Sequence, residues 1–144
     1  MKTVLIFFAT AVLFIGFSGC SYLHYPRADE YAKQAKGATT VETLLNLTTM
    51  MEASSQAAKG GKGEDQSLDD LHNQFHALNN TLCCIEKAKR ETPAYDLAVT
   101  HNKELWTIFK RVWKFRKTQP QRDDHLDLFV TEIKELRETL ALLK

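Results

Sequence analysis

The chain has little of what several common fold and function classes require. It has three prolines and six glycines in 144 residues, too few for the closely spaced turns of an all-β fold. Its formal net charge is +1, so it lacks the basic excess that nucleic-acid binding needs, and we expect no nucleic-acid partner. Its main apolar run, residues 4–17, is shorter than the roughly 20 residues of a membrane-spanning helix.

Motifs for catalysis and cofactor binding are also missing. The sequence contains no Gly-x-Ser-x-Gly nucleophile motif, no glycine-rich phosphate loop ending in Lys-Ser or Lys-Thr, and no Cys-x-x-Cys-His haem attachment motif. The glycine-rich segment 59–66 has the composition of a flexible loop between helices. We therefore expect neither enzymatic activity nor a bound cofactor.

The first twenty residues have the pattern of an export signal. Lys2 gives a positively charged start, residues 4–17 are apolar, and two small residues precede Cys20. The segment Phe17-Ser18-Gly19-Cys20 resembles the lipobox of bacterial lipoproteins, although leucine is the usual residue at its first position. An ordinary cleaved signal peptide and an uncleaved anchor are the alternatives.

This resemblance implies a lipid anchor and a cellular location. In bacterial lipoproteins the cysteine becomes the first residue and carries acyl chains such as palmitate, which here places the lipid on Cys20 and attaches the chain to a membrane. Ser21, rather than aspartate, follows the cysteine, which in that family implies the periplasmic face of the bacterial outer membrane. We expect a signal peptide over 1–19, a lipidated tether over 20–28 and a helical domain over 29–144.

Apolar residues recur at helical spacing through most of the remaining chain. Thr39 and Glu42 have the spacing of a capping box before a helix over 40–58, and Ser67 suits the cap of the next. Thr92 precedes a proline that suits the first turn of a third helix, which we expect to end at Gln119-Pro120. Asp123 lies near the start of the last helix, and a short helix over 28–36 precedes the others. The pattern predicts an all-α fold, specifically an antiparallel four-helix bundle.

Each long helix has an apolar seam that should face the core. The seams are Val41, Leu44, Thr48 and Met51; Leu68, Leu71, Phe75, Leu78, Leu82 and Ile85; Ala98, His101, Leu105, Ile108, Val112 and Phe115; and Leu126, Phe129, Ile133, Leu136, Leu140 and Leu143. The third helix has a second stripe, formed by Tyr95, Val99, Asn102, Trp106, Phe109 and Trp113.

The second stripe has two interpretations. A central helix that packs on two neighbours needs a wide apolar face. Alternatively, Trp106, Phe109 and Trp113 form a partner-docking surface for an apolar helical segment. The residues at the rim of this surface are basic: Lys110, Lys114 and Arg116. Such residues can form a solvated helix end, or can contact an acidic partner or anionic lipid.

Three histidines suggest a metal site. His72 and His76 are spaced i, i+4 on one helix, and His101 is on the seam of the next, so the three could share a metal ion. No Glu-x-x-His motif supports them, and the first two lie on the flank of a seam, where they could simply face solvent.

Cys83 and Cys84 are adjacent in a predicted helix, where their side chains diverge by about 100°. A disulfide between them would distort the backbone. Burial against another helix, an intermolecular disulfide, and redox or metal chemistry are the alternatives.

Together these patterns predict a bacterial envelope lipoprotein that is not an enzyme. Its helical domain would bind a protein partner or stabilise an envelope assembly. In size and anchor it is similar to the small helical pilotin lipoproteins of secretion systems, on architecture alone. One alternative is a periplasmic helical sensor of a metal or small molecule. Another is a secreted, cytokine-like signalling protein with Cys20 in a disulfide.

Overall fold

The fold of this chain is all-α, as the apolar periodicity predicts. The computed structural model describes residues 25–59 and 64–144, and within these ranges there is no strand. The predicted signal peptide, Cys20 and the beginning of the tether lie outside the described residues. The described helices are α1 (Pro26–Gln34), α2 (Thr40–Lys59), α3 (Glu64–Leu82), α4 (Lys87–Arg90), α5 (Pro93–Lys114) and α6 (Gln119–Ala141).

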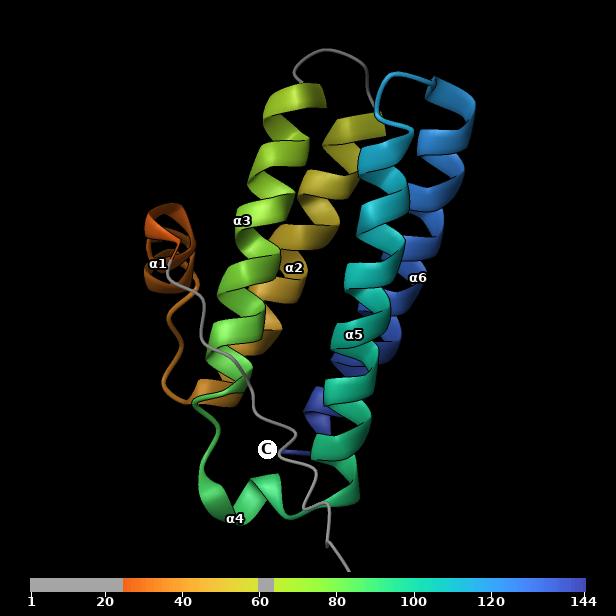
Figure 1. The fold of residues 1–144 in the computed structure, drawn as a ribbon. Coiled ribbons are helices and arrows are strands. Elements are labelled where there is room, and N and C mark those ends of the chain that lie inside the picture. Colours follow the sequence, from red (N-terminus) through yellow and green to blue (C-terminus); the bar gives the residue numbers. More distant parts are fainter. Residues whose placement is uncertain (1–24, 60–63) are drawn as a thin grey trace, which may run out of the picture.

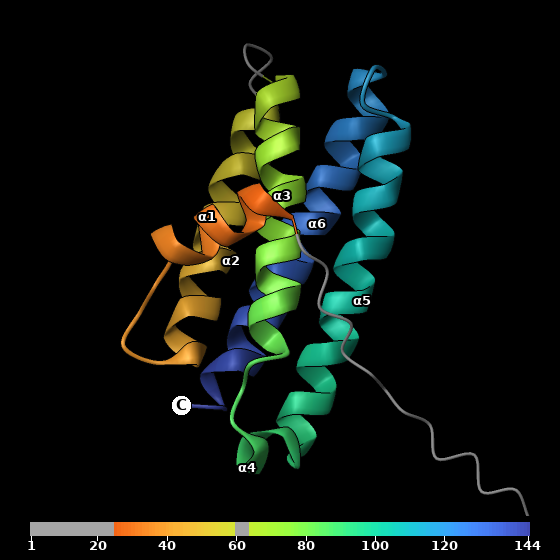
Figure 2. The same cartoon turned by 60° about the vertical axis from the view of Figure 1, so that its left-hand side comes forward.

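Four long helices make up most of the molecule. Figure 1 shows α2, α3, α5 and α6 side by side, with α2 packed against both α3 and α6, and α5 packed mainly against α6. The short helix α4 lies between the end of α3 and the start of α5. Helix α1 lies across the outside of α3, as the turned view in Figure 2 shows. In the described part of the chain, no helix combines the length and apolarity needed to cross a bilayer.

The predicted seams form the core. All six seam residues of α3 and the following turn, from Leu68 to Ile85, are buried, as are all six of the last helix and its end, from Leu126 to Leu143. Helix α5 contributes Leu105 at its centre, but its seam residues His101 and Phe115 are only half-buried. Burial of these side chains is the main source of the fold's stability, at roughly 25 cal/mol per Å² of apolar surface.

Side chains fix the starts of two helices. At α2, the Thr39 hydroxyl accepts a hydrogen bond from the Glu42 N–H (3.1 Å). The Glu42 carboxylate accepts one from the Ala38 N–H (2.8 Å), one residue earlier than a standard capping box. The backbone at Gly37 packs closely on Glu42: a Cβ added at Gly37 would lie 2.5 Å from the Glu42 Cβ. At α5, the predicted cap Thr92 accepts a hydrogen bond from the Tyr95 N–H (3.4 Å).

Several predicted helix boundaries are wrong. Helix α3 begins at Glu64, so Ser67 lies inside it and is not its cap. Helix α5 ends at Lys114, and Gln119-Pro120 begins α6 instead of ending α5, because a first-turn proline loses no helical hydrogen bond. Helix α4 was not predicted.

Helix α1 begins earlier than predicted and shortens the tether. It starts at Pro26, and the Ala28 side chain is buried against the core, so residues 26–28 of the predicted tether belong to the folded domain. Arg27 pairs with Asp69 and with Asp70 (2.9 Å) on α3. The Tyr31 hydroxyl also donates to the Asp70 carboxylate (2.7 Å), and burial together with this bond raises the Tyr31 pKa to about 12. Polar contacts thus fix α1 across α3.

A matched pair of leucine substitutions tests the assigned core. Leu105 on α5 is completely buried, whereas Leu128 on α6 is 51% exposed. Leu105→Ala should lower the free energy of unfolding by about 2–5 kcal/mol, because it removes buried surface and leaves a cavity. Leu128→Ala should change it by less than about 0.5 kcal/mol. Urea unfolding followed by circular dichroism measures both, and equal losses would contradict the assigned core.

Candidate binding site between α3 and α5

Seven aromatic rings, in stacked, tilted and edge-on contacts, lie between α3 and α5. We call them the aromatic cluster, whose members are Tyr25, His72, Phe75, His76, Trp106, Phe109 and Trp113. Across the two helices, the His72 and Phe109 rings are nearly parallel with centroids 5.5 Å apart, and those of Phe75 and Trp106 are 5.1 Å apart. Tyr25, just before α1, stacks on His76 at 3.9 Å. Aromatic contacts therefore join two helices that make few other contacts.

One side of the cluster opens into a pocket, which we call the aromatic pocket. It has a volume of about 310 Å³, and its lining is His72, Trp106, Phe109, Lys110 and Trp113. Four of these five, all except His72, belong to the docking surface or rim predicted from the sequence. Phe109 is only 3% exposed and belongs to the core, whereas Trp113 is 43% exposed at the opening. The volume is at the lower end of the range for small-molecule sites and also suits one apolar side chain.

The remaining predicted rim residues lie beside the pocket and do not line it. The Arg116 guanidinium lies 4.9 Å from the centroid of the Trp113 ring, and it donates a hydrogen bond to the Trp113 carbonyl (2.9 Å). The Lys114 ammonium lies over Phe115, 5.4 Å from that ring's centroid. Arg116 therefore holds the Trp113 ring in place, while Lys110 is the cation that faces the pocket.

His72 and His76 belong to the aromatic cluster and do not simply face solvent. Their Nε2 atoms are 3.0 Å apart, so one ring donates a hydrogen bond to the other. His76 is 4% exposed, and its buried Nδ1 has no hydrogen-bond partner among the described residues. Burial, followed by the proximity of His72, lowers the His76 pKa to about 4, and burial lowers the His72 pKa as well. Both rings are therefore neutral near pH 7.

The three histidines predicted to share a metal do not come together. His72 and His76 face the aromatic cluster, whereas His101 faces α6 and lies 2.6 Å from a Glu132 oxygen. His101 lies on the seam of α5 that packs on α6, and not on the stripe that faces α3. In the described ranges, the one group of three metal-ligating side chains is His101, Glu132 and Glu135.

The two adjacent cysteines differ in their environment. Cys84 is free and exposed, and its thiol donates to the Asn80 carbonyl (Sγ to O, 3.4 Å). Cys83 is half-buried and is not a free thiol. Because Cys84 is free, the two do not bond to each other. Both lie in the turn after α3, which ends at Leu82, and not within a helix as predicted.

Sequence patterns show only part of this site. The stripe on α5 gives Trp106, Phe109 and Trp113 directly. His72 and Tyr25 come from other elements, and no spacing within α5 indicates which face of α3 it meets. The one available signal was the position of His72 and His76 beside the Leu71 and Phe75 seam, where helix flanks pack against a neighbour.

The buried histidine makes stability depend on pH. Because the folded state lowers the His76 pKa from its ordinary value of about 6.5, the unfolded chain takes up a proton first as the pH falls. The free energy of unfolding should thus decrease by about 1 kcal/mol between pH ~7 and ~5.5 from His76 alone. Urea unfolding at both pH values should show a smaller decrease in His76→Asn. An identical decrease in the variant would mean that His76 does not titrate in this way.

Comparison with known proteins assigns no family to this geometry. No family model matches the chain, and neither the curated proteins nor the solved structures include one similar to it. The function is therefore inferred from the residues of the site and from the sequence.

Proposed function

We propose that this chain is a bacterial envelope lipoprotein without enzymatic activity, whose helical domain binds a protein partner through the aromatic pocket. Its four long helices act as an antiparallel four-helix bundle that holds the pocket between α3 and α5. The observation that carries the proposal is the concave, aromatic lining of the pocket, with Trp113 exposed at its opening. Exposed tryptophans in such concave sites are typical binding hot spots.

Charge around the pocket supports a partner with acidic residues. Lys110 lines the pocket, and three exposed basic residues follow within seven positions: Arg111, Lys114 and Lys117. An apolar side chain would fill the pocket, and acidic residues beside it would meet these cations. The partner is therefore an amphipathic helical segment that presents an apolar anchor flanked by aspartate or glutamate.

The membrane anchor rests on the sequence alone. The lipobox-like segment before Cys20 supports lipidation, and Ser21 supports delivery to the outer membrane, where the domain would face the periplasm. Because Tyr25 already packs on His76, only four residues, 21–24, separate Cys20 from the folded domain. At about 3.3–3.6 Å per residue, this tether spans less than roughly 20 Å, so the pocket lies close to the membrane.

Substitution of Trp113 tests the docking surface. The chain is captured with its partner from the membranes of the cell that produces it, and the segment cross-linked beside Lys110 is identified and synthesised. Trp113→Ala should weaken binding of that segment at least about tenfold, because it removes a hot-spot ring at the opening. Lys110→Glu should also weaken binding, and the loss of affinity should be larger at low salt than at high salt. Fluorescence anisotropy of the labelled segment measures each dissociation constant.

Leu97→Ala is the matched control for this experiment. Leu97 is also an exposed apolar residue on α5, but it does not line the pocket. Its substitution should leave the dissociation constant unchanged. Equal binding by wild type and Trp113→Ala, or a cross-linked segment without acidic residues, contradicts the proposal. Circular dichroism checks that each variant retains its helices.

A second candidate function follows from Cys83. Cys83 is not a free thiol, Cys84 is free, and the third cysteine of the sequence is Cys20. A Cys20–Cys83 disulfide would leave no thiol on Cys20 for lipid. The chain would then be a secreted helical protein that binds its partner in solution, as a cytokine-like signal does.

Mass spectrometry of the mature amino terminus separates the two candidates. If the chain is a lipoprotein, the mature protein should begin at Cys20 and carry acyl groups, and its mass should not change on reduction. Peptide mapping without reductant should then show no peptide that joins Cys20 to Cys83. An unlipidated Cys20 in a peptide joined to Cys83 would replace the lipoprotein with the secreted alternative.

A further inference from the structure

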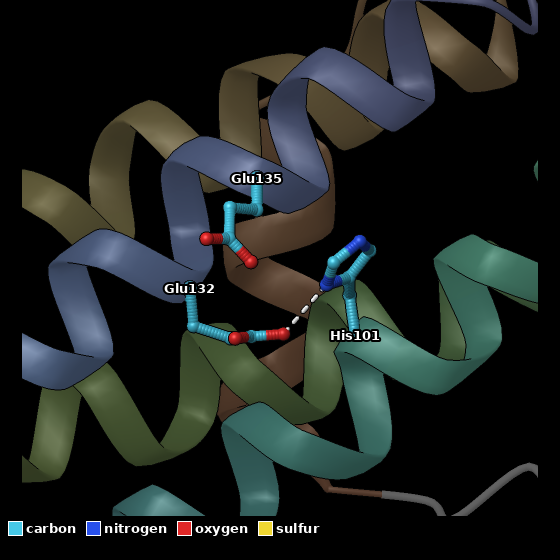
Figure 3. Close-up of side chains that lie close together, drawn as sticks. All are labelled: His101, Glu132 and Glu135. Carbon is cyan, nitrogen blue, oxygen red and sulfur yellow. Dashed lines mark hydrogen bonds and ion pairs between the residues drawn. The ribbon is translucent and has the colours of Figure 1, made fainter.

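A second group of side chains lies where α5 packs on α6, away from the aromatic pocket. His101 on α5 and Glu132 on α6 are mostly buried, with 14% and 13% of their side chains exposed, and His101 Nδ1 lies 2.6 Å from a Glu132 oxygen. Glu135 follows three residues later on α6. Figure 3 shows its carboxylate pointing toward the His101–Glu132 pair. One ligand atom from each residue lies within 4.8 Å of the others.

The contact between His101 and Glu132 leaves a second carboxylate, that of Glu135, beside the same imidazole. Glu132 contacts His101, whereas the Glu135 carboxylate makes no hydrogen bond or ion pair with any residue in the described ranges. Two carboxylates that converge on one imidazole repel each other unless a cation lies between them. The arrangement has one more acidic group than its single imidazole can neutralise.

We propose that His101, Glu132 and Glu135 bind a divalent transition-metal ion, for which Zn²⁺ is the best-suited candidate. One imidazole nitrogen and two carboxylate oxygens form a donor set that zinc accepts, and neutral imidazole favours zinc over calcium or magnesium. The ligands project from the middle of two long helices, which hold them more firmly than a loop would.

The spacing of the ligand atoms suits this ion. Atoms bound to one tetrahedral zinc at about 2.0–2.2 Å lie roughly 3.3–3.6 Å from each other. The present separations, from 2.6 Å to at most 4.8 Å, bracket that range, so rotation of side chains suffices and no helix has to move. Glu135 is exposed, so the ion can enter from solvent and retain water as its fourth ligand.

Zinc titration of the full-length chain in detergent, without an affinity tag, tests the proposal. Isothermal titration calorimetry should show one Zn²⁺ bound per chain, and the melting temperature should rise with Zn²⁺ concentration. Glu132→Gln and Glu135→Gln should each weaken binding by more than about tenfold, since loss even of an outer-shell contact commonly costs this much. Because Glu135 is exposed, its variant tests the site without changing the core.

A control variant replaces two histidines that lie outside the proposed site. The double variant His72→Gln, His76→Gln should bind Zn²⁺ as the wild type does, because these rings belong to the aromatic cluster. Substitution by Co²⁺ should give the strong visible absorption of a four-coordinate site, and Glu135→Gln should abolish it. The proposal is overturned if the wild type shows no saturable Zn²⁺ binding, if the glutamate variants bind normally, or if only the double histidine variant loses the ion.

Discussion

The fold depends on how α5 buries two apolar stripes at once. Its seam, centred on Leu105, packs against α6, and its second stripe, which carries Trp106 and Phe109, faces α3. Helices α5 and α6 pack closely along their length, whereas α5 contacts α3 mostly through large aromatic side chains. Rings of this size keep α3 and α5 apart and cannot fill the space between them completely. The aromatic pocket and a second hollow of about 410 Å³ on the other side of Trp106 follow from this packing.

Much of the architecture could be predicted from the sequence, because burial imposes a period that the sequence must carry. The α3 and α6 seams are buried at every predicted position, and Thr92 caps α5 as predicted. The ends of helices were harder to predict, since proline is compatible with both interpretations of Gln119-Pro120: it can follow one helix or open the next. Only the short turn at residues 115–118 decides between them, and its sequence has no strong helix-breaking signal.

The site was less predictable, because it depends on which helix faces meet. The sequence supplies the α5 half, whereas Tyr25 and His72 come from elements whose orientation is set by the whole packing arrangement. The same limit applies to His101, whose neighbour Glu132 is 31 residues away and follows no recognised motif. Asp69 and Asp70 show a related effect. Their position near the start of α3 suits the helix dipole, and the structure also uses them to hold α1 through Arg27 and Tyr31.

The position of the tryptophans has a practical consequence for any study of this chain in solution. The sequence contains only two, Trp106 and Trp113, and both line the aromatic pocket. Intrinsic tryptophan fluorescence of the whole protein therefore comes entirely from that one place. A molecule that enters there changes the polarity around both indoles and is detected without a label, whereas binding at a site remote from both rings leaves the emission spectrum largely unaffected.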